Sequence, residues 1–382
     1  MQIYVVKPGD TIWNIARRYR IPPQSLLVTN GITGAARLVI GQTLVIPVGG
    51  VPKAYGTIEA NGFIQPSNPQ RERSVLAESA RSLTYVTPFS HHVNPDGTLT
   101  ALNTGTIEAV SAANRAALLL SVTNITGTAG ANFNTVLIDT IINSSRLKQN
   151  LINNILIQLR RGNYKGVIID FEKISPSNRN KYNQFLRELT ARLHPRYFTG
   201  AALAPKTSDV TTGAWHGAHD YRAIGEIVDF VVIMTYEWGW SGGPPMAVAP
   251  IDQVRKVINY AVSVIRPGKI MMGIPLYGYD WTLPYVEGGK FAKAIGNQEA
   301  IDLAGAQNAA ISYDYKAQSP HYGYTDRNGR RHIVWFEDAR SVEAKYKLAA
   351  AYKLRGVSFW SLAKPFPQNW RVLQNMFTIS KY

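Results

Sequence analysis

Eight apolar, strand-like segments separated by helix-like stretches limit this chain of 382 residues to very few folds. The apolar segments span residues 54–63, 83–89, 117–123, 166–171, 198–204, 228–236, 270–277 and 356–360. The clearest helical pattern lies at 146–161, where leucine and isoleucine recur at every fourth position. Near-continuous apolar strands that alternate with helices indicate an α/β protein with a parallel sheet, and eight such units predict a (β/α)₈ TIM barrel. The first candidates for an active site therefore lie at the carboxyl ends of the strands.

The fourth apolar segment ends in two carboxylates, Asp170 and Glu172. Because side chains alternate faces along a strand, Ile168, Asp170 and Glu172 share one face. Carboxylates avoid dry interiors unless they are paired, and one member of such a pair tends to keep its proton at neutral pH. A pair that shares a proton suits acid catalysis on a glycosidic bond. Carboxylates that are solvated, or paired with Arg or Lys, would give the same pattern, so both interpretations stay open at this point.

Aromatic side chains gather at the other strand ends, where they would offer stacking surfaces to sugar rings. Besides the carboxylates, we predict that Tyr236 takes part in catalysis and that the aromatic residues Phe89, Tyr277, Trp281 and Trp360 contact the substrate. Met234 and Asp280 stand at the same strand ends, and we predict substrate contacts from them as well. We favour the site role for Trp360 over a place in the barrel core, and Asp280 and Trp281 could be loop or cap residues.

Residues 285–336 interrupt the alternation between the seventh and eighth strands. They contain a helix-like stretch at 290–300, strand-like stretches at 310–315, 321–325 and 331–336, and the dipeptide Asn328-Gly329. An Asn-Gly pair between strand-like runs is a strong signal for a β-hairpin. We predict a small α+β insertion on the catalytic face.

The N-terminal segment 1–48 has the order strand, helix, helix, strand. Asp10 or Thr11 would cap its first helix, and Asn30-Gly31 would end its second. A Gly-Gly-Val-Pro-Lys linker follows at 49–53. The predicted organisation is a small domain at 1–48, this linker, and a barrel domain at 54–382.

Composition excludes some functions and leaves others open. The chain has no cysteine, so that disulfides and thiolate metal sites are excluded. His91-His92 lack further ligands at suitable spacing, and we expect neither a metal nor a cofactor. The formal charge of +16 favours polyanionic partners, but the basic residues are scattered and no nucleic-acid module is evident. We also expect no membrane span and no standard signal peptide, and we expect a monomer.

The N-terminal segment resembles the LysM module, through Tyr4-Val-Val-Lys-Pro-Gly-Asp-Thr-Ile-Trp-Asn-Ile-Ala16, Asn30 and Leu38-Val-Ile-Gly-Gln-Thr-Leu-Val-Ile-Pro47. LysM modules bind glycans that contain N-acetylglucosamine, in peptidoglycan or chitin. The resemblance implies a sugar groove between two loops, formed by Gly9, Asp10, Thr11, Ile12, Asn30, Gly31 and Ile32. With a single copy, we expect modest affinity for a short glycan.

The large domain resembles glycoside hydrolase family 18, whose fourth strand carries Asp-Gly-x-Asp-x-Asp-x-Glu. This chain reads Lys165-Gly-Val-Ile168-Ile-Asp170-Phe-Glu172, so that Lys165 and Ile168 replace the first two acids. The resemblance implies that Glu172 is the catalytic acid and Asp170 its helper, that Met234-x-Tyr236 is the sixth-strand motif, and that Trp360 is the floor of the sugar site.

The resemblance also implies a retaining, substrate-assisted mechanism. Glu172 would protonate the glycosidic oxygen, and the acetamido oxygen of the sugar would attack C1. Asp170 would orient the acetamido N–H, and Tyr236 would bind the acetamido oxygen. We further expect the apolar Ile168 beneath Asp170 to raise the pKa of that carboxyl, so that it shares a proton with Glu172.

Two C-terminal motifs, Val334-Trp-Phe-Glu-Asp-Ala-Arg-Ser341 and Gly356-Val-Ser-Phe-Trp-Ser-Leu362, make the whole chain similar to the spore cortex-lytic N-acetylglucosaminidases of Bacillus-type bacteria. The implied function is hydrolysis of spore peptidoglycan during germination, and the implied location is the spore coat or cortex surface. The alternatives are a chitinase-like family 18 hydrolase and a non-catalytic glycan-binding coat protein. The alternative location is the cell wall or the extracellular space.

Overall fold

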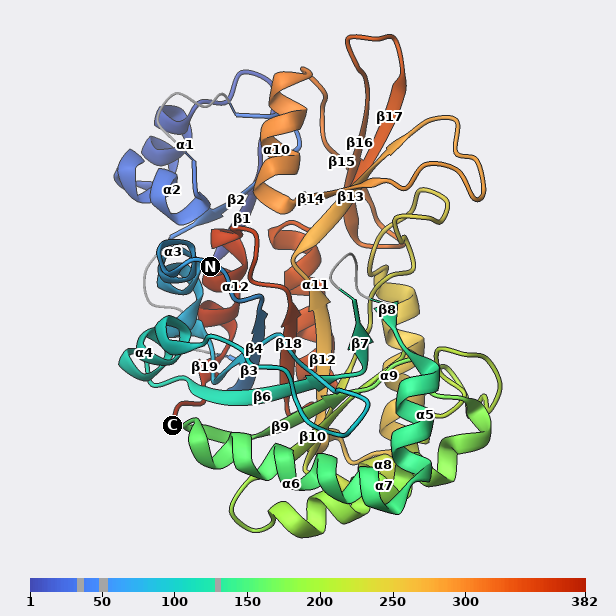
Figure 1. The fold of residues 1–382 in the computed structure, drawn as a ribbon. Helices are drawn as coiled ribbons and strands as arrows, with labels where there is room; N and C mark the ends of the chain where they lie inside the picture. Colours follow the sequence, from blue (N-terminus) through green and yellow to red (C-terminus); the bar gives the residue numbers. More distant parts are fainter. Residues whose placement is uncertain (33–37, 48–53, 128–131) are drawn as a thin grey trace.

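The computed structural model describes residues 1–32, 38–47, 54–127 and 132–382. Its centre is a closed barrel of eight parallel strands, and each strand pairs with the next in chain order (Figure 1). They are β3 (Thr57–Ile64), β4 (Tyr85–Pro88), β6 (Ala117–Thr123), β9 (Tyr164–Asp170), β10 (Phe198–Leu203), β11 (Phe230–Ile233), β12 (Ile270–Pro275) and β18 (Gly356–Trp360). Pairing of β18 with β3 closes the ring. The predicted TIM barrel is confirmed, because all eight apolar segments form its strands.

Helices cover the outside of the barrel. They are α3 (Pro69–Ser79), α4 (Gly105–Ala113), α5 (Thr135–Asn143), α6 (Ser145–Arg161), α7 (Arg179–Leu193), α8 (Tyr221–Ile227), α9 (Ile251–Val264), α11 (Ala339–Ala351) and α12 (Pro367–Met376). One large apolar core lies between these helices and the strands. A second, smaller core fills the barrel interior and contains Phe63, Leu119, Ile168, Phe230 and Met271. The interior is therefore packed, and a ligand can enter only at an end of the barrel.

The insertion forms an antiparallel five-stranded sheet above the barrel (Figure 1). Its strands are β13 (Tyr277–Thr282), β14 (Lys293–Gly296), β15 (Ser312–Asp314), β16 (Ser319–Thr325) and β17 (Arg331–Trp335), and α10 (Asn297–Ala306) packs beside them. The hairpin predicted at Asn328-Gly329 joins β16 to β17. The sheet begins before the predicted start at 285, because β13 follows directly from barrel strand β12. A helix was predicted at 290–300, and only its last four residues are helical: β14 pairs with β13, and α10 starts after Gly296 and continues to Ala306.

The N-terminal domain has the predicted βααβ order. It consists of β1 (Gln2–Val5), α1 (Ile12–Tyr19), α2 (Pro23–Asn30) and β2 (Thr43–Ile46), and β1 and β2 are antiparallel. Thr11 caps α1 by accepting a hydrogen bond from the Asn14 amide at 3.1 Å. Gly31, in the left-handed conformation, ends α2. The predicted linker at 49–53 lies outside the described residues.

Buried polar contacts hold this domain against the barrel and its insertion. Gln368 of α12 donates to the Asn30 side chain at 3.0 Å and to the Thr43 carbonyl at 2.6 Å. The backbone amide of Ile311 donates to the Ile40 carbonyl at 2.8 Å. These contacts place the N-terminal domain beside the insertion, on the side of the barrel where the strands end (Figure 1).

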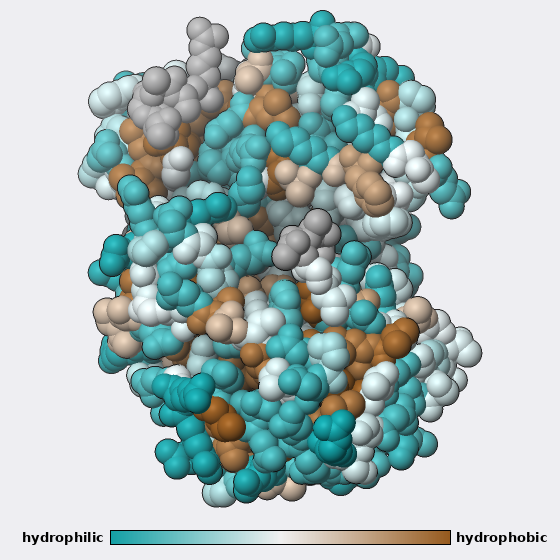
Figure 2. Space-filling model, in the orientation of Figure 1, coloured by the Kyte–Doolittle hydropathy of each residue, from teal (hydrophilic) through white to brown (hydrophobic). Residues whose placement is uncertain are grey.

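The surface shown in Figure 2 is largely polar, with apolar side chains scattered between the polar ones. Among the described residues, no helix combines the length and the hydropathy that crossing a membrane requires.

Candidate active site

Asp170 and Glu172 lie at the carboxyl end of the barrel, as the strand pattern predicted. Asp170 is the last residue of β9, and both side chains are buried, with 6% and 8% of their residue surface exposed. Burial raises the pKa of Asp170 to about 7. Burial also raises the pKa of Glu172 well above its ordinary value, and the charges of Asp170 and Glu237 raise it further, whereas Lys173 lowers it. Two coupled carboxyl groups that resist ionisation hold a proton at neutral pH, which is the requirement for a general acid.

One oxygen of this pair is buried without a hydrogen-bond partner among the described residues. Oδ1 of Asp170 is fully buried and accepts no hydrogen bond from any described residue. An unpaired buried acceptor costs about 1–3 kcal/mol, so that native proteins rarely contain one without a functional reason. The arrangement favours a ligand that brings its own hydrogen-bond donor to Asp170.

Tyr236 and Glu237 extend the site from the end of β11. Burial raises the pKa of Tyr236 well above its ordinary value, so that its hydroxyl stays protonated and can donate. Gly273 of β12 makes room for this ring, because a Cβ atom there would lie 2.8 Å from Tyr236 Cε1. Glu237 accepts hydrogen bonds from the hydroxyl groups of Tyr277 and Tyr279, the latter at 3.0 Å. Desolvation within the cleft raises the pKa of Glu237, whereas these two hydroxyl groups lower it.

A cleft of about 810 Å³ opens over the carboxylates. Its predicted lining residues are Phe89, Asp170, Glu172, Met234, Tyr236, Tyr277 and Trp360. Phe89 and Trp360 pack edge to face, with ring centroids 4.6 Å apart, and both rings remain partly exposed. Trp215 and Trp240 also line the cleft and are about half exposed. Aromatic faces around a carboxylate pair can stack on the apolar faces of sugar rings.

Two predicted substrate-binding residues do not line the cleft. Asp280 accepts hydrogen bonds from Tyr324 Oη at 2.7 Å and from His332 Nδ1 at 2.9 Å, within the insertion. Trp281 is 2% exposed and donates from its indole nitrogen to the Gly243 carbonyl. The prediction was wrong for both, because β13 leaves the barrel and joins the insertion sheet. Only Tyr277 and Tyr279 of this strand face the cleft.

Sequence reasoning missed several residues of the cleft. Glu237 directly follows the recognised Met234-x-Tyr236 motif, and Tyr279 stands two positions after Tyr277 on the same strand face. Tyr279 was therefore accessible to the alternation rule, whereas that rule would place Glu237 on the face opposite Tyr236. Trp215 and Trp240 come from loops, and no periodic pattern indicates where a loop side chain points.

The backbone around Glu172 is held from both sides. Asn124, which follows β6, accepts from the Glu172 amide at 3.0 Å and donates to the Glu172 carbonyl at 2.9 Å. His219, buried beyond β10, contacts the Phe171 carbonyl through Nε2 at 3.1 Å and accepts from the Ala204 amide through Nδ1 at 2.9 Å. Because Nδ1 accepts, the imidazole proton is on Nε2, which therefore donates to Phe171.

The predicted LysM groove residues fall into two groups. Gly9, Asp10, Thr11 and Ile12 lie in the loop before α1 and at its start, and Asp10 there accepts from Tyr4 Oη at 2.7 Å. The other group is Asn30, Gly31 and Ile32. Asn30 is fully buried: its amide bonds to Leu26, Val45 and Gln368, so that the side chain has no group left for a sugar. A Cβ atom on Gly31 would lie 2.8 Å from Pro367 of α12.

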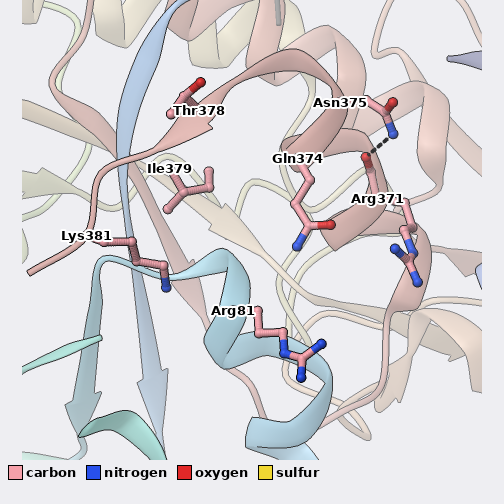
Figure 3. Close-up of a pocket in the computed structure, with 7 residues that line it drawn as sticks. All are labelled: Arg81, Arg371, Gln374, Asn375, Thr378, Ile379 and Lys381. Atoms are coloured by element: carbon pink, nitrogen blue, oxygen red, sulfur yellow. Dashed lines mark hydrogen bonds between the residues drawn. The ribbon is translucent and has the colours of Figure 1, made fainter. Parts of the chain in front are cut away.

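A second cavity of about 450 Å³ lies at the opposite end of the barrel, beside the short strand β19 (Thr378–Ile379) that pairs with the start of β3. Figure 3 shows Arg81, Arg371, Gln374 and Lys381 around it. The Lys381 amine donates to the carbonyls of Ala80, Leu83 and Asn114. Among the described residues, no carboxylate lines this cavity, so its lining offers no acid for a glycosidic bond.

His91 and His92 form β5, which pairs with β6, and Nδ1 of His91 bonds to the Thr100 carbonyl at 2.7 Å. Within the described ranges, no group of three or more His, Asp or Glu side chains could hold a metal ion.

The family model described as glycosyl hydrolases family 18 matches residues 62–364, and the LysM domain model matches residues 4–47. The chain belongs to glycosyl hydrolase family 18. It is therefore a glycosidase by family, and it carries a LysM domain at its N-terminus.

Full-length relatives share this combination. The "Cortical fragment-lytic enzyme" of Bacillus subtilis is 41% identical, over 100% of this chain and 99% of the relative. The crystal structure of the Bacillus cereus spore cortex-lytic enzyme SleL superposes with a TM-score of 0.94 at 36% identity, covering 100% and 99% of the two chains. The SleL structure from Bacillus megaterium QM B1551 gives a TM-score of 0.82 at 40% identity, covering 100% and 87%. The predicted resemblance to the cortex-lytic family is thus confirmed.

The two departures from the family motif have different surroundings. Lys165 is exposed at the far end of β9, with its amine 5.8 Å from the centre of the Tyr382 ring. Ile168 lies in the apolar interior of the barrel and is fully buried. The raised pKa of Asp170 has the direction predicted for a carboxyl group above an apolar layer.

Proposed function

We propose that this chain hydrolyses spore-cortex peptidoglycan or its fragments during germination, as a retaining, substrate-assisted N-acetylglucosaminidase of the spore coat or cortex surface. The observation that carries the proposal is the buried Asp170–Glu172 pair at the floor of an aromatic cleft. The full-length likeness to enzymes named as cortex-lytic supports the choice of substrate.

In this mechanism, Glu172 gives its proton to the glycosidic oxygen, and the C1–O bond to the leaving sugar breaks. The 2-acetamido oxygen of the bound sugar attacks C1, which forms a cyclic oxazolinium-type intermediate. Water then adds to C1 with Glu172 as the base, so that the configuration is retained. An acetyl group held in position for attack supplies the advantage of an intramolecular nucleophile.

The unpartnered oxygen of Asp170 supports its part in this scheme. An acetamido N–H that donates to Oδ1 would satisfy this buried acceptor and place the acetamido oxygen toward C1. The Tyr236 hydroxyl, held protonated by burial, would donate to the acetamido oxygen. Phe89 and Trp360 would form the stacking floor of this subsite, with Met234 and Tyr277 beside it.

The test is turnover by Glu172→Gln on muropeptides prepared from spore cortex. We expect hydrolysis to fall by about 10²-fold or more, since an acid of this kind contributes roughly 10²–10⁴-fold. Glycan binding should persist, because the amide keeps the size of the carboxyl group. Substantial residual hydrolysis would remove Glu172 from its role.

Two further measurements test the substrate-assisted step and the bond that is cleaved. N-deacetylated substrate should be inert, and its rapid cleavage would contradict attack by the acetamido group. Mass spectrometry of the products should show N-acetylglucosamine at the new reducing end. Muramic acid at that end would contradict the proposed specificity.

We also propose that the LysM domain binds N-acetylglucosamine-containing glycan through the loop of Gly9, Asp10, Thr11 and Ile12, together with Ile32. Asn30 then supports the groove and does not bind the sugar, because its side chain bonds to β2 and to Gln368 of α12, and Gly31 allows the close approach of Pro367. Titration of the protein with peptidoglycan fragments, with Thr11→Ala as the variant, tests this assignment.

A further inference from the structure

The catalytic strand ends before its catalytic acid. The last residue pairs of β9 are Asp170 with Thr123 of β6 and Ile169 with Ala201 of β10. Glu172 lies beyond both, where the backbone ladders have stopped. A residue there would ordinarily have the freedom of a loop, yet a general acid must keep its carboxyl group within a fraction of an ångström of the scissile oxygen.

Beyond the end of β9, side chains form the hydrogen bonds to the backbone that neighbouring strands would otherwise form. Asn124 forms two hydrogen bonds with the Glu172 backbone, one to the amide and one to the carbonyl, at 3.0 and 2.9 Å. The side-chain amide of Asn124 thus imitates the peptide group of a neighbouring strand. Its Nδ2 also donates to the Asn134 carbonyl at 3.2 Å, and the Asn134 amide donates to the Asn124 carbonyl at 2.9 Å.

On the other side of β9, His219 bridges β9 to β10. Its Nε2 donates to the Phe171 carbonyl at 3.1 Å, and its Nδ1 accepts from the Ala204 amide at 2.9 Å. Only 1% of its surface is exposed, and burial keeps the imidazole neutral by lowering its pKa to about 4. A neutral ring with one donor and one acceptor is the only form that fits these two partners.

These contacts fix both peptide groups that flank the Cα atom of Glu172. The preceding peptide is held at the Phe171 carbonyl and the Glu172 amide, and the following one at the Glu172 carbonyl. The two peptide planes determine the direction of the Cα–Cβ bond, and therefore the point and direction from which the side chain of Glu172 extends toward the cleft.

We propose that Asn124 and His219 are positioning residues that aim the Glu172 carboxyl at the scissile bond by holding its two flanking peptide groups. Neither residue lines the cleft, and neither needs to touch the substrate. The inference rests on the proposed role of Glu172 as the acid.

The test compares Asn124→Ala with Asn369→Ala as a matched control. Asn369 is also fully buried and accepts a hydrogen bond from Tyr346, but it lies on α12, away from the cleft. We expect Asn124→Ala to lower kcat by about 10²-fold, the cost of roughly 1 Å of misplacement, with KM nearly unchanged. The control should keep wild-type kcat, even though both variants lose melting temperature.

Asn124→Asp adds a readout that a purely structural role would not give. When protonated, this aspartic acid keeps an acceptor for the Glu172 amide and an O–H donor for the Glu172 carbonyl. When ionised, it loses the donor. Its kcat should therefore recover toward the wild-type value at acid pH and fall as pH rises, while Asn124→Ala stays low throughout. His219→Gln, whose amide also offers one donor and one acceptor, should retain more kcat than His219→Ala.

An Asn124→Ala variant with the kcat of the control would overturn the inference, as would parallel pH profiles for the Ala and Asp variants. If Asn124→Ala does not fold, the Asp variant and the His219 pair decide the outcome in the same way. A wild-type protein that releases no products from cortex muropeptides would instead overturn the proposed function, and this inference with it.

Discussion

Replacing Asp170 by asparagine should stabilise the protein and inactivate it at the same time. Burial raises the pKa of this carboxyl from 3.8 to about 7. Below pH 3.8, the carboxyl is protonated in both the folded and the unfolded state, and its titration does not change the free energy of unfolding. Between that pH and about 7, the unfolded chain releases the proton and the folded protein does not, so stability falls as pH rises.

The size of the effect follows from the two pKa values. At about 1.36 kcal/mol for each pH unit, the difference between the folded and unfolded pKa values of Asp170 corresponds to about 4 kcal/mol. Above pH 7, the free energy of unfolding of the wild type is lower by this full amount. The asparagine side chain would carry no such titration. The variant should therefore gain up to about 4 kcal/mol over the wild type at pH 8 and almost nothing at pH 4. Its kcat should fall by at least about 10²-fold, because the acetamido group would lose the charge that stabilises it.

Urea unfolding at both pH values, followed by tryptophan fluorescence, measures the gain. Asp96→Asn is the control: the Asp96 carboxyl is exposed, and its hydrogen bonds to Thr98 hold its pKa below the ordinary value. Its replacement should change stability in the opposite direction at neutral pH. An equal gain for Asp170→Asn at pH 4 and pH 8, or no gain at pH 8, would refute the argument that desolvation of Asp170 is a cost to the fold.

Three other variants test two ion pairs of the barrel domain and the apolar layer beneath Asp170. Lys345→Met leaves the buried Glu337 without its partner, whose amine lies 2.8 Å away, and should lower the free energy of unfolding by about 3–5 kcal/mol. Lys347→Met, at an exposed pair on the same helix, should cost less than about 1 kcal/mol in the same urea titration. Ile168→Asp replaces the apolar layer beneath Asp170 by an ionisable group, and should shift the pH–rate profile of hydrolysis. An unchanged profile would show that the apolar layer does not tune the carboxylate pair.

The barrel was predictable because its strands are buried on both faces. Such strands read as apolar runs, and eight of them in one domain leave little choice of fold. The position of Asp170 and Glu172 followed from the same rule, since every strand of a barrel presents its carboxyl end on one side. Their chemistry followed only in part: the sequence indicated a carboxylate pair, and the structure adds that one oxygen of Asp170 is buried without a donor among the described residues.

The errors have a common physical cause. Alternation along a strand tells which side chains share a face, but it does not tell which sheet the strand joins. Asp280 and Trp281 follow barrel strand β12, yet β13 pairs with β14 and β17 of the insertion. Asp280 then lies on the face opposite Tyr277 and Tyr279, bonded to Tyr324 and His332, and Trp281 is buried beside Tyr279 further along the strand. The start predicted for the helix at 290–300 was wrong for the same reason, because pairing with β13 holds 293–296 as a strand and α10 begins at Asn297.

Asn124 and His219 mark the limit of sequence reasoning most clearly. Each contacts a residue 48 positions away along the chain, through backbone groups that every residue possesses. A backbone acceptor leaves no signature in the sequence of its partner, so no local pattern could have connected either residue to the fourth strand. They become visible only when the barrel brings the ends of β6, β9 and β10 together. The pairing of β9 with β6 and β10 supplies a side-chain partner on each side of Glu172, at the point where the backbone pairing of β9 has ended.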